Sequence, residues 1–178
     1  MPSNREVNPR FLPCTTAMPR NRIVVRAELC TGCRACQVAC VVSHEGLFGV
    51  STARIHVLKD EPQGLDTPQV CRLCGRAPCA AVCPTNALFR HHSTAAVLLN
   101  SEDCTTCSAC AEACPFDMIV LHPETGLPLI CDLCGGEPAC VKRCPTGAIS
   151  YGDAPADRNQ YPAAAFVTPG DQPQCDPD

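Results

Sequence analysis

Cysteine spacing constrains this chain more than any other feature of its sequence. Sixteen of the 18 cysteines among its 178 residues fall into four groups of four. The groups are run one (Cys30, Cys33, Cys36, Cys40), run two (Cys71, Cys74, Cys79, Cys83), run three (Cys104, Cys107, Cys110, Cys114) and run four (Cys131, Cys134, Cys140, Cys144). Runs one and three have the tight spacing C-x-x-C-x-x-C-x-x-x-C, whereas runs two and four have a longer middle gap. The chain therefore contains a pair of runs, tight then long, twice over.

The composition predicts a thin hydrophobic core. The chain has no Trp, five Phe and two Tyr, and it contains 18 Pro and 11 Gly. Small folds that are short of core are usually held together by disulfides or by metal. A short chain this rich in cysteine points to one of these two cross-links.

Metal is favoured over disulfides, because disulfides persist in oxidising compartments. The first 25 residues contain no apolar stretch typical of a signal peptide and no twin-arginine pair. No segment reaches the roughly 18–20 apolar residues of a membrane span. We therefore expect a cytoplasmic protein without direct membrane insertion, whose reduced thiols bind metal. The alternative is that the chain is exported in complex with a partner that carries its own signal.

The tight spacing is typical of bacterial ferredoxins. Three cysteines placed two residues apart on a curling loop can reach three corners of one iron–sulfur cube, while the fourth ligates the other cluster of a pair. Small residues between the cysteines, such as Gly32 and Ala109, suit a loop that wraps closely around a cofactor. Sixteen cysteines as iron ligands predict four 4Fe-4S clusters.

Zinc is the alternative metal, because paired C-x-x-C motifs also make tetrahedral structural sites. A third cysteine only two residues further on is unusual for zinc, as is a following Cys-Pro such as Cys83-Pro84. A zinc-stabilised interaction module without redox activity is the second hypothesis. A four-cluster protein with a catalytic cluster of its own is the third, and it requires a cluster that lacks one thiolate.

The gaps between the runs predict how the runs pair. Between runs two and three, NALF, a polar turn at 91–94 and AAVLLN predict a short hairpin inside a two-cluster unit. The segments NRIVVRAE (21–28) and AISY (148–151) are strand candidates that would pair as a terminal hairpin. ARIHVLK (53–59) is a further strand candidate, so the connection after run one is more than a turn.

We therefore expect an α+β fold of small β-hairpins and short helices. It would consist of two bacterial-ferredoxin-like, two-cluster units, one inserted in the other, with extended terminal arms. The expected divisions are an N-terminal extension (1–20), an outer unit with runs one and four (21–67 and 123–152), an inserted unit with runs two and three (68–122) and a Pro/Asp/Ala-rich C-terminal arm (153–178).

Run one lacks the proline that follows the last cysteine of the other runs, and reads Cys40-Val41. Proline disfavours helix at the preceding residue and cannot continue one. We expect a short helix to continue past Cys40, on the longer excursion toward the inserted unit.

Four motifs carry a family resemblance: CTGCRACQVACVVSH, CRLCGRAPCAAVCPTNAL, CTTCSACAEACPFDMI and CDLCGGEPACVKRCPTGAI. Together they resemble the four-cluster ferredoxin-type electron-transfer subunits of redox enzymes. That family includes the beta subunits of molybdenum and tungsten oxidoreductases and small carriers of formate- and CO-oxidising hydrogenase systems. The resemblance covers about residues 21–152.

The resemblance implies that run one pairs with run four, and run two with run three. The implied ligands are Cys30, Cys33, Cys36 and Cys144 for cluster 1; Cys71, Cys74, Cys79 and Cys114 for cluster 2; Cys104, Cys107, Cys110 and Cys83 for cluster 3; and Cys131, Cys134, Cys140 and Cys40 for cluster 4. The alternative keeps each fourth cysteine on the cluster of its own run.

The implied function is electron transfer by a subunit that is not itself an enzyme and has no catalytic residues. Ligation of every iron by cysteine leaves no open position for a substrate. The sequence offers no nucleotide-binding motif, and its scattered histidines are expected to be structural or solvated: His44, His56, His91, His92 and His122.

The run-four motif, with HEGLFGVSTARIHV upstream, looks most like the small iron–sulfur subunits of tungsten or molybdenum aldehyde oxidoreductases. This likeness implies a catalytic partner subunit with a tungsten- or molybdenum-pterin, and any flavin- or NAD-handling site would belong to another subunit. The equivalent carrier of a formate dehydrogenase, hydrogenase or CO dehydrogenase is the alternative. The holoprotein would carry a net charge near about −12, which argues against nucleic acid as a partner.

The ends of the chain differ from its body. The 26 residues from 153 onward contain five Pro, five Asp and five Ala, a composition that does not fold alone. We expect the ends to pack on this chain or to clamp a neighbour, either the catalytic partner or, by self-association, a second copy. The apolar anchors would be Tyr161, Phe166 and Val167, and the leftover Cys14 and Cys175 would be free thiols.

Overall fold

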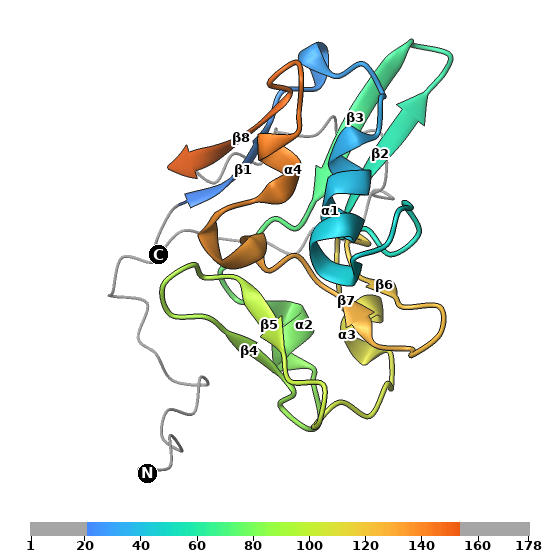
Figure 1. The fold of residues 1–178 in the computed structure, drawn as a ribbon. Coiled ribbons are helices and arrows are strands. Elements are labelled where there is room, and N and C mark those ends of the chain that lie inside the picture. Colours follow the sequence, from blue (N-terminus) through green and yellow to red (C-terminus); the bar gives the residue numbers. More distant parts are fainter. Residues whose placement is uncertain (1–20, 154–178) are drawn as a thin grey trace.

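The computed structural model describes residues 21–153, which form four two-stranded antiparallel sheets connected by short helices (Figure 1). The strands are β1 (Asn21–Val25), β2 (Ile55–Asp60), β3 (Leu65–Val70), β4 (Leu88–Arg90), β5 (Val97–Leu99), β6 (Val120–Leu121), β7 (Pro128–Leu129) and β8 (Ile149–Asp153). The helices are α1 (Ala35–Glu45), α2 (Pro78–Ala81), α3 (Ala109–Glu112) and α4 (Ala139–Lys142), with 3-10 turns η2 (Ala27–Leu29) and η3 (Leu133–Gly136). The predicted small α+β fold is confirmed. The expected terminal arms, their anchors and both leftover cysteines lie outside the described residues.

β1 and β8 pair although they come from opposite ends of the described chain, and Figure 1 shows them side by side. The register places Asn21 opposite Asp153 and Val25 opposite Ile149. Alternate side chains of β1 face the interior, and Ile23, Val25 and Ile149 are buried. The predicted pairing of the segment before run one with the segment after run four is confirmed.

β4 and β5 form the hairpin predicted between runs two and three. Leu88 pairs with Leu99 and Arg90 with Val97. The chain reverses directly after β4, where the His91 N–H donates to the Ala96 carbonyl oxygen at 2.8 Å.

β2 overlaps the predicted strand segment 53–59 and extends one residue beyond it, and it pairs with β3, a strand that the sequence analysis did not predict. The register joins Ile55 to Val70 and Val57 to Pro68. The Val57 N–H also donates to Oε1 of Gln37 at 3.3 Å, and this buried bond ties β2 to α1.

The core consists of two small clusters of buried side chains. The first contains Ile23, Val25, Cys36, Cys40, Val41, Ala53, Ile55, Val57, Val70, Ala96, Cys131, Leu133, Cys140 and Ile149. The second contains Ala77, Leu88, Val97, Cys110, Ile119 and Ile130. Five cysteines are therefore part of the core itself, and no aromatic side chain belongs to either cluster of the described residues. The thin core that the composition predicted is present.

Helix α1 shows the effect of the missing proline. It runs 11 residues and carries Cys40 in its interior, whereas α2, α3 and α4 have four residues each and end before a Cys-Pro pair. It ends at Gly46, whose φ of 67° lies in the left-handed region that favours glycine. The predicted continuation of the helix past Cys40 is confirmed.

Substitution Val41→Pro would give run one the Cys-Pro ending of the other runs. Proline inside a helix removes a hydrogen bond and clashes with the preceding turn, at a cost of about 3 kcal/mol or more. We expect the apparent Tm of the anaerobic holoprotein, followed by circular dichroism, to fall by roughly 6–12 °C. Val41→Ala is the control, because it also removes the buried Val41 side chain but preserves the helix. Equal losses in the two variants would contradict the role given to the helix.

Candidate iron–sulfur sites

The four cysteine runs adopt curled loops that place non-glycine residues in the left-handed region. The residues with positive φ inside the runs are Arg34 in run one, Leu73 and Ala77 in run two, Thr106 and Ser108 in run three, and Leu133 and Cys134 in run four, besides the glycines Gly32, Gly135 and Gly136. Equivalent positions recur, since Leu73 and Leu133 each lie between the first two cysteines of a long run. Such conformations cost about 1–3 kcal/mol each and persist only where the surroundings impose them. The loops are therefore built for close contact with something that they surround.

Three backbone N–H groups, one inside a run and two from residues outside the runs, donate to cysteine sulfur. The donors are Gly32 to Cys30 Sγ at 3.5 Å, Arg54 to Cys40 Sγ at 3.3 Å and Met118 to Cys114 Sγ at 3.4 Å. Hydrogen bonds of this kind stabilise thiolate sulfur and are among the features that tune iron–sulfur clusters.

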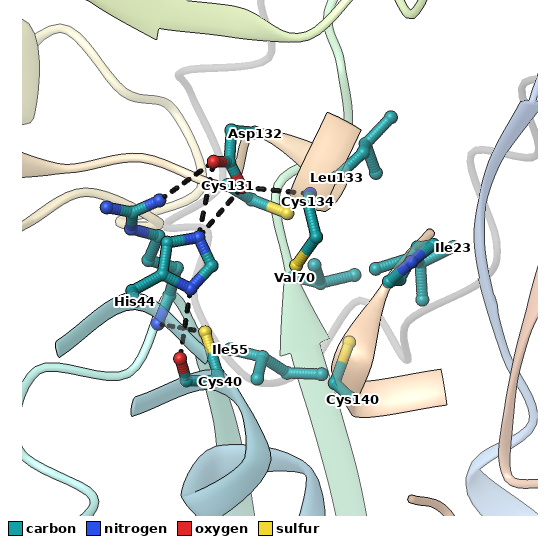
Figure 2. A pocket seen from close by; sticks show the side chains of 12 residues that line it. Ile23, Cys40, His44, Ile55, Val70, Cys131, Asp132, Leu133, Cys134 and Cys140 are labelled. Atoms are coloured by element: carbon teal, nitrogen blue, oxygen red, sulfur yellow. Dashed lines mark hydrogen bonds and ion pairs between the residues drawn. The ribbon is translucent and has the colours of Figure 1, made fainter. Parts of the chain in front are cut away.

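The run-four site brings together cysteines from two runs. Cys40 of run one lines one pocket with Cys131, Cys134 and Cys140 of run four, and Figure 2 shows their sulfur atoms around a common space. The remaining lining is mostly apolar. Burial raises the pKa of Cys140 to about 12, and the neighbouring thiols of Cys40 and Cys134 contribute to the rise. Thiols in such surroundings become thiolates only when a strongly cationic partner binds them and stabilises their negative charge. A metal cluster is such a partner.

A polar group adjoins this pocket (Figure 2). Nε2 of His44 lies 3.0 Å from Oδ1 of Asp132, and Nδ1 of His44 lies 2.9 Å from the carbonyl oxygen of Cys40. Nη1 of Arg54 lies 3.1 Å from Oδ2 of Asp132. The Asp132 carboxylate also accepts from the Cys134 N–H at 3.0 Å. The group therefore connects the backbone of two cysteines that line the pocket.

The hydrogen bonds of this polar group shift the pKa of both His44 and Asp132 toward their charged forms. The hydrogen bond to Asp132, and then the bond to Cys40, raise the pKa of His44 to about 10. Burial alone would raise the pKa of Asp132, but the bonds from His44 and the Cys134 N–H hold it well below its usual range. A ring nitrogen of His44, a carboxylate oxygen of Asp132 and Sγ of Cys134 also lie within 4.8 Å of one another. Because both His44 nitrogens are already engaged, we interpret the group as support for the loop.

The run-one site has the reciprocal composition. Cys144 of run four lines a pocket with Cys30, Cys33 and Cys36 of run one. Burial raises the pKa of Cys36 to about 11, and the thiols that add to the rise are those of Cys30, Cys144 and Cys33. The Asp66 side chain lies against Gly32, where any Cβ would collide with its carboxylate.

In runs two and three, one thiol from run three lies near the run-two cysteines. Burial raises the pKa of Cys71 to about 12, and the contributing thiols are Cys74, Cys79 and Cys114, the last from run three. In run three, burial raises the pKa of Cys110, and the thiols of Cys104 and Cys107 add to the rise.

The fourth predicted member of the run-three site is Cys83. Its thiol packs against the second core cluster, which contains Cys110, and α2 packs against α3. Burial alone would raise the pKa of Cys83, but hydrogen bonds from the Leu88, Thr85 and Ala87 backbone lower it. The ligand sets themselves stay a prediction.

Thiols of different predicted sets lie near enough to raise one another's pKa. The Cys36 thiol of run one contributes to the raised pKa of Cys140 in run four. The Cys71 thiol of run two contributes to the raised pKa of Cys131, also in run four. These neighbours predict a row of sites in the order run one, run four, run two and run three. Among the sixteen described cysteines, the two that are exposed are Cys33 and Cys107, which belong to the two ends of this row.

The sequence analysis expected all five histidines to be structural or solvated. His44 is structural, as described above. Nδ1 of His91 lies 3.0 Å from the Thr94 hydroxyl within the predicted turn, and Nε2 of His122 lies 4.0 Å from Glu45. Sequence reasoning missed the contributions of Arg54 and Asp132, because Asp132 lies 88 residues from His44.

Within residues 21–153, no helix has the length and apolar character that crossing a membrane requires.

The 4Fe-4S dicluster domain family matches residues 63–154 of the chain. A similar protein is the "Aliphatic sulfonate oxidoreductase, polyferredoxin-like subunit" of Pyrococcus furiosus, 43% identical over 122 residues, with 68% of this chain and 70% of that protein covered. "Protein NrfC" of Escherichia coli is 39% identical over 141 residues, and the matched region spans 71% of this chain but 62% of NrfC. "Electron transport protein HydN" of Escherichia coli is 37% identical over 152 residues, with 71% and 85% covered.

Among solved structures, a chain of the "Active site complex BamBC of Benzoyl Coenzyme A reductase in complex with Benzoyl-CoA" is similar, with 26% identity and a TM-score of 0.45 over 74% of this chain and 78% of that chain. The family match covers more than half of this chain, and the relative from Pyrococcus furiosus extends the similarity at high identity. The chain therefore belongs to the 4Fe-4S dicluster domain family.

Proposed function

We propose that this chain is the electron-transfer subunit of an oxidoreductase complex and that it carries four 4Fe-4S clusters. The observation that carries the proposal is the gathering of thiols from two runs around each of two pockets, in a row of neighbouring sites. The names of its relatives, which include electron-transport and polyferredoxin-like proteins, support the same function.

The proposed ligand sets are those implied by the family resemblance, with Cys144, Cys114, Cys83 and Cys40 as the ligands exchanged between runs. When bound, each cluster takes up and releases one electron. The chain's own residues position the sulfur atoms, exclude water from the buried sites and supply N–H donors to sulfur. Because each set contains four thiols, we propose no substrate chemistry at the clusters.

The proposed architecture is an outer ferredoxin-like unit (21–67 and 123–152) with an inserted one (68–122). The β1–β8 pairing and the β4–β5 hairpin support it. Strand β3 and the β6–β7 hairpin cross the proposed boundaries, so the two units would share elements at their junction.

The partner that we propose is a tungsten- or molybdenum-dependent aldehyde oxidoreductase subunit, on the basis of the run-four motif. The equivalent subunit of a formate dehydrogenase, hydrogenase or CO dehydrogenase complex is the alternative. The relatives' names include an aliphatic sulfonate oxidoreductase subunit and the "Thiosulfate reductase electron transfer subunit PhsB", which supports a catalytic oxidoreductase partner in general.

The cofactor content is tested on the full chain purified anaerobically. We expect about sixteen iron and about sixteen acid-labile sulfide per chain, with brown colour, because each cluster holds about four of each. About four zinc and no colour would instead establish the zinc-stabilised module.

The exchange of ligands between runs is tested with pairs of cysteine substitutions. Cys144→Ala combined with Cys30→Ala removes two ligands of one proposed site, so it should lose about as much iron as either single variant, roughly four per chain. Cys144→Ala combined with Cys131→Ala affects two proposed sites and should lose about twice as much. If each run held its own cluster, these two outcomes would be reversed.

The partner is tested by tagging the chain in its native host and analysing the purified complex for metals. We expect tungsten or molybdenum to co-purify in an amount close to that of the catalytic subunit. A complex that contains the iron–sulfur chain but neither metal would refute the aldehyde oxidoreductase partner and leave the electron-transfer function standing.

A further inference from the structure

The last cysteine of each run accepts hydrogen bonds at its sulfur, and in three of the runs the donors follow it closely in the chain. Cys83 and Cys144 each accept from backbone N–H groups two, four and five residues further on. Cys114 accepts from the N–H of Met118, four residues further on, at 3.4 Å. Proline follows the cysteine in each of these runs. Because proline cannot continue a helix, the chain turns there and its next N–H groups reach the sulfur.

Cys40, the last cysteine of run one, cannot use this arrangement. It is followed by Val41 and lies inside α1, so the N–H groups of residues 41–45 belong to the helix. In an α-helix each N–H donates to the carbonyl oxygen four residues earlier, so these groups are not available to the Cys40 sulfur. The missing proline therefore has a second consequence: a donor to this sulfur must come from outside α1.

The donor that reaches Cys40 is the backbone N–H of Arg54, 14 residues further on, which lies 3.3 Å from Sγ. Arg54 joins a turn to strand β2. The turn is closed by the Ala53 N–H, which donates to the Val50 carbonyl oxygen at 3.3 Å, and β2 begins at Ile55. A donor from a separate segment is well placed only if that segment is held against α1.

The Arg54 side chain anchors this segment to run four. Its Nη1 lies 3.1 Å from Oδ2 of Asp132, and the two side chains are 20% and 29% exposed. The same carboxylate accepts from the Cys134 N–H at 3.0 Å, which fixes it on the run-four loop. A half-buried ion pair between ordered segments is screened less by water than an exposed pair. The start of β2 is therefore held against the run-four loop.

His44 connects the end of α1 to the same carboxylate. Its Nδ1 lies 2.9 Å from the Cys40 carbonyl oxygen and its Nε2 lies 3.0 Å from Oδ1 of Asp132, and Figure 2 shows the ring between them. Carbonyl and carboxylate oxygens only accept hydrogen bonds, so both ring nitrogens donate. Asp132 thus joins α1, which carries the Cys40 sulfur, to Arg54, which carries the donor.

We propose that His44, Asp132 and Arg54 are positioning residues that hold the Arg54 N–H against the Cys40 sulfur, in place of the Cys-Pro turn of the other runs. The inference rests on the proposed function, because the hydrogen bond affects electron transfer only when a cluster occupies the run-four site. A donor places a partial positive charge beside the sulfur, so it stabilises the electron that the cluster takes up. That electron comes from a one-electron donor, and no covalent bond forms or breaks.

The experiment measures the reduction potential of the run-four site in the full anaerobic holoprotein. A mediated titration with dithionite is followed by electron paramagnetic resonance, and Cys134→Ala identifies the run-four signal as the one that is lost. Arg54→Pro removes the N–H at the start of a strand, where proline is tolerated. We expect the equilibrium constant for reduction of this site to fall about tenfold, which is about 59 mV for a one-electron couple.

Two control variants separate the hydrogen bond from other effects of the substitution. Arg54→Met removes the guanidinium but keeps the N–H, so the constant should fall only about threefold. Ser51→Pro introduces proline into the same turn, at an exposed second position that favours proline. It leaves the Arg54 N–H in place, so the run-four signal should not move.

The role of Asp132 is tested by substitutions with and without its charge. Asp132→Glu keeps the charge but displaces the carboxylate by one methylene, so positioning predicts a fall of about threefold, whereas a purely electrostatic role predicts no shift. Asp132→Asn should lower the constant in the wild type but not in Arg54→Pro, where no donor remains to be positioned. Asp132→Glu decides the matter if Arg54→Pro does not retain its iron.

The inference is wrong if Arg54→Pro and Arg54→Met keep their iron and shift the run-four signal equally, because the charge and not the N–H would then be responsible. It is also wrong if Asp132→Glu keeps its iron and leaves the signal unmoved. Wild-type protein without iron would instead refute the proposed function, so the two failures are distinguishable.

Discussion

The rest of the structure depends on two shared pockets, one that Cys40 lines with the run-four cysteines and one that Cys144 lines with the run-one cysteines. Cys40 can lie beside the run-four thiols only if α1 packs against α4, and Cys144 can reach run one only if β8 returns to β1. Each exchanged cysteine therefore requires a contact between segments that are far apart in the chain. In a protein with little apolar core, these contacts hold distant segments together. The two ends of the described chain meet in the β1–β8 sheet.

The cysteine loops are energetically unfavourable unless they surround a bound group. Positive φ at residues such as Leu73 and Ser108 is unfavourable, and burial disfavours the charged form of thiols such as Cys71. Both penalties are offset when thiolates bind a cationic cluster, because the curled backbone then directs its N–H groups toward sulfur. We therefore expect metal binding and folding to be coupled, as in other small metal-dependent folds.

Much of the architecture was predictable, because it follows from local signals. The pattern of NRIVV predicted β1, the polar turn after NALF predicted the β4–β5 hairpin, and Val41 in place of proline predicted that α1 continues past Cys40. Strand β3 was missed because LDTPQV lacks an apolar alternation, yet Thr67 and Gln69 are buried by pairing with β2. The His44–Asp132–Arg54 group was missed because it exists only after distant segments meet.

The four sites differ in the residues that lie between and after their cysteines, not in the cysteines themselves. All four sets are proposed to contain four cysteines, so the ligands alone give the sites no reason to differ. The loops of runs two and four are repeats with similar backbones, but one carries Arg72 where the other carries Asp132. A residue one position from a ligand changes the local charge while it leaves the sulfur atoms in place. Asp132 is itself paired with His44 and Arg54, so the charge at a loop position acts together with the partners that the fold brings to it.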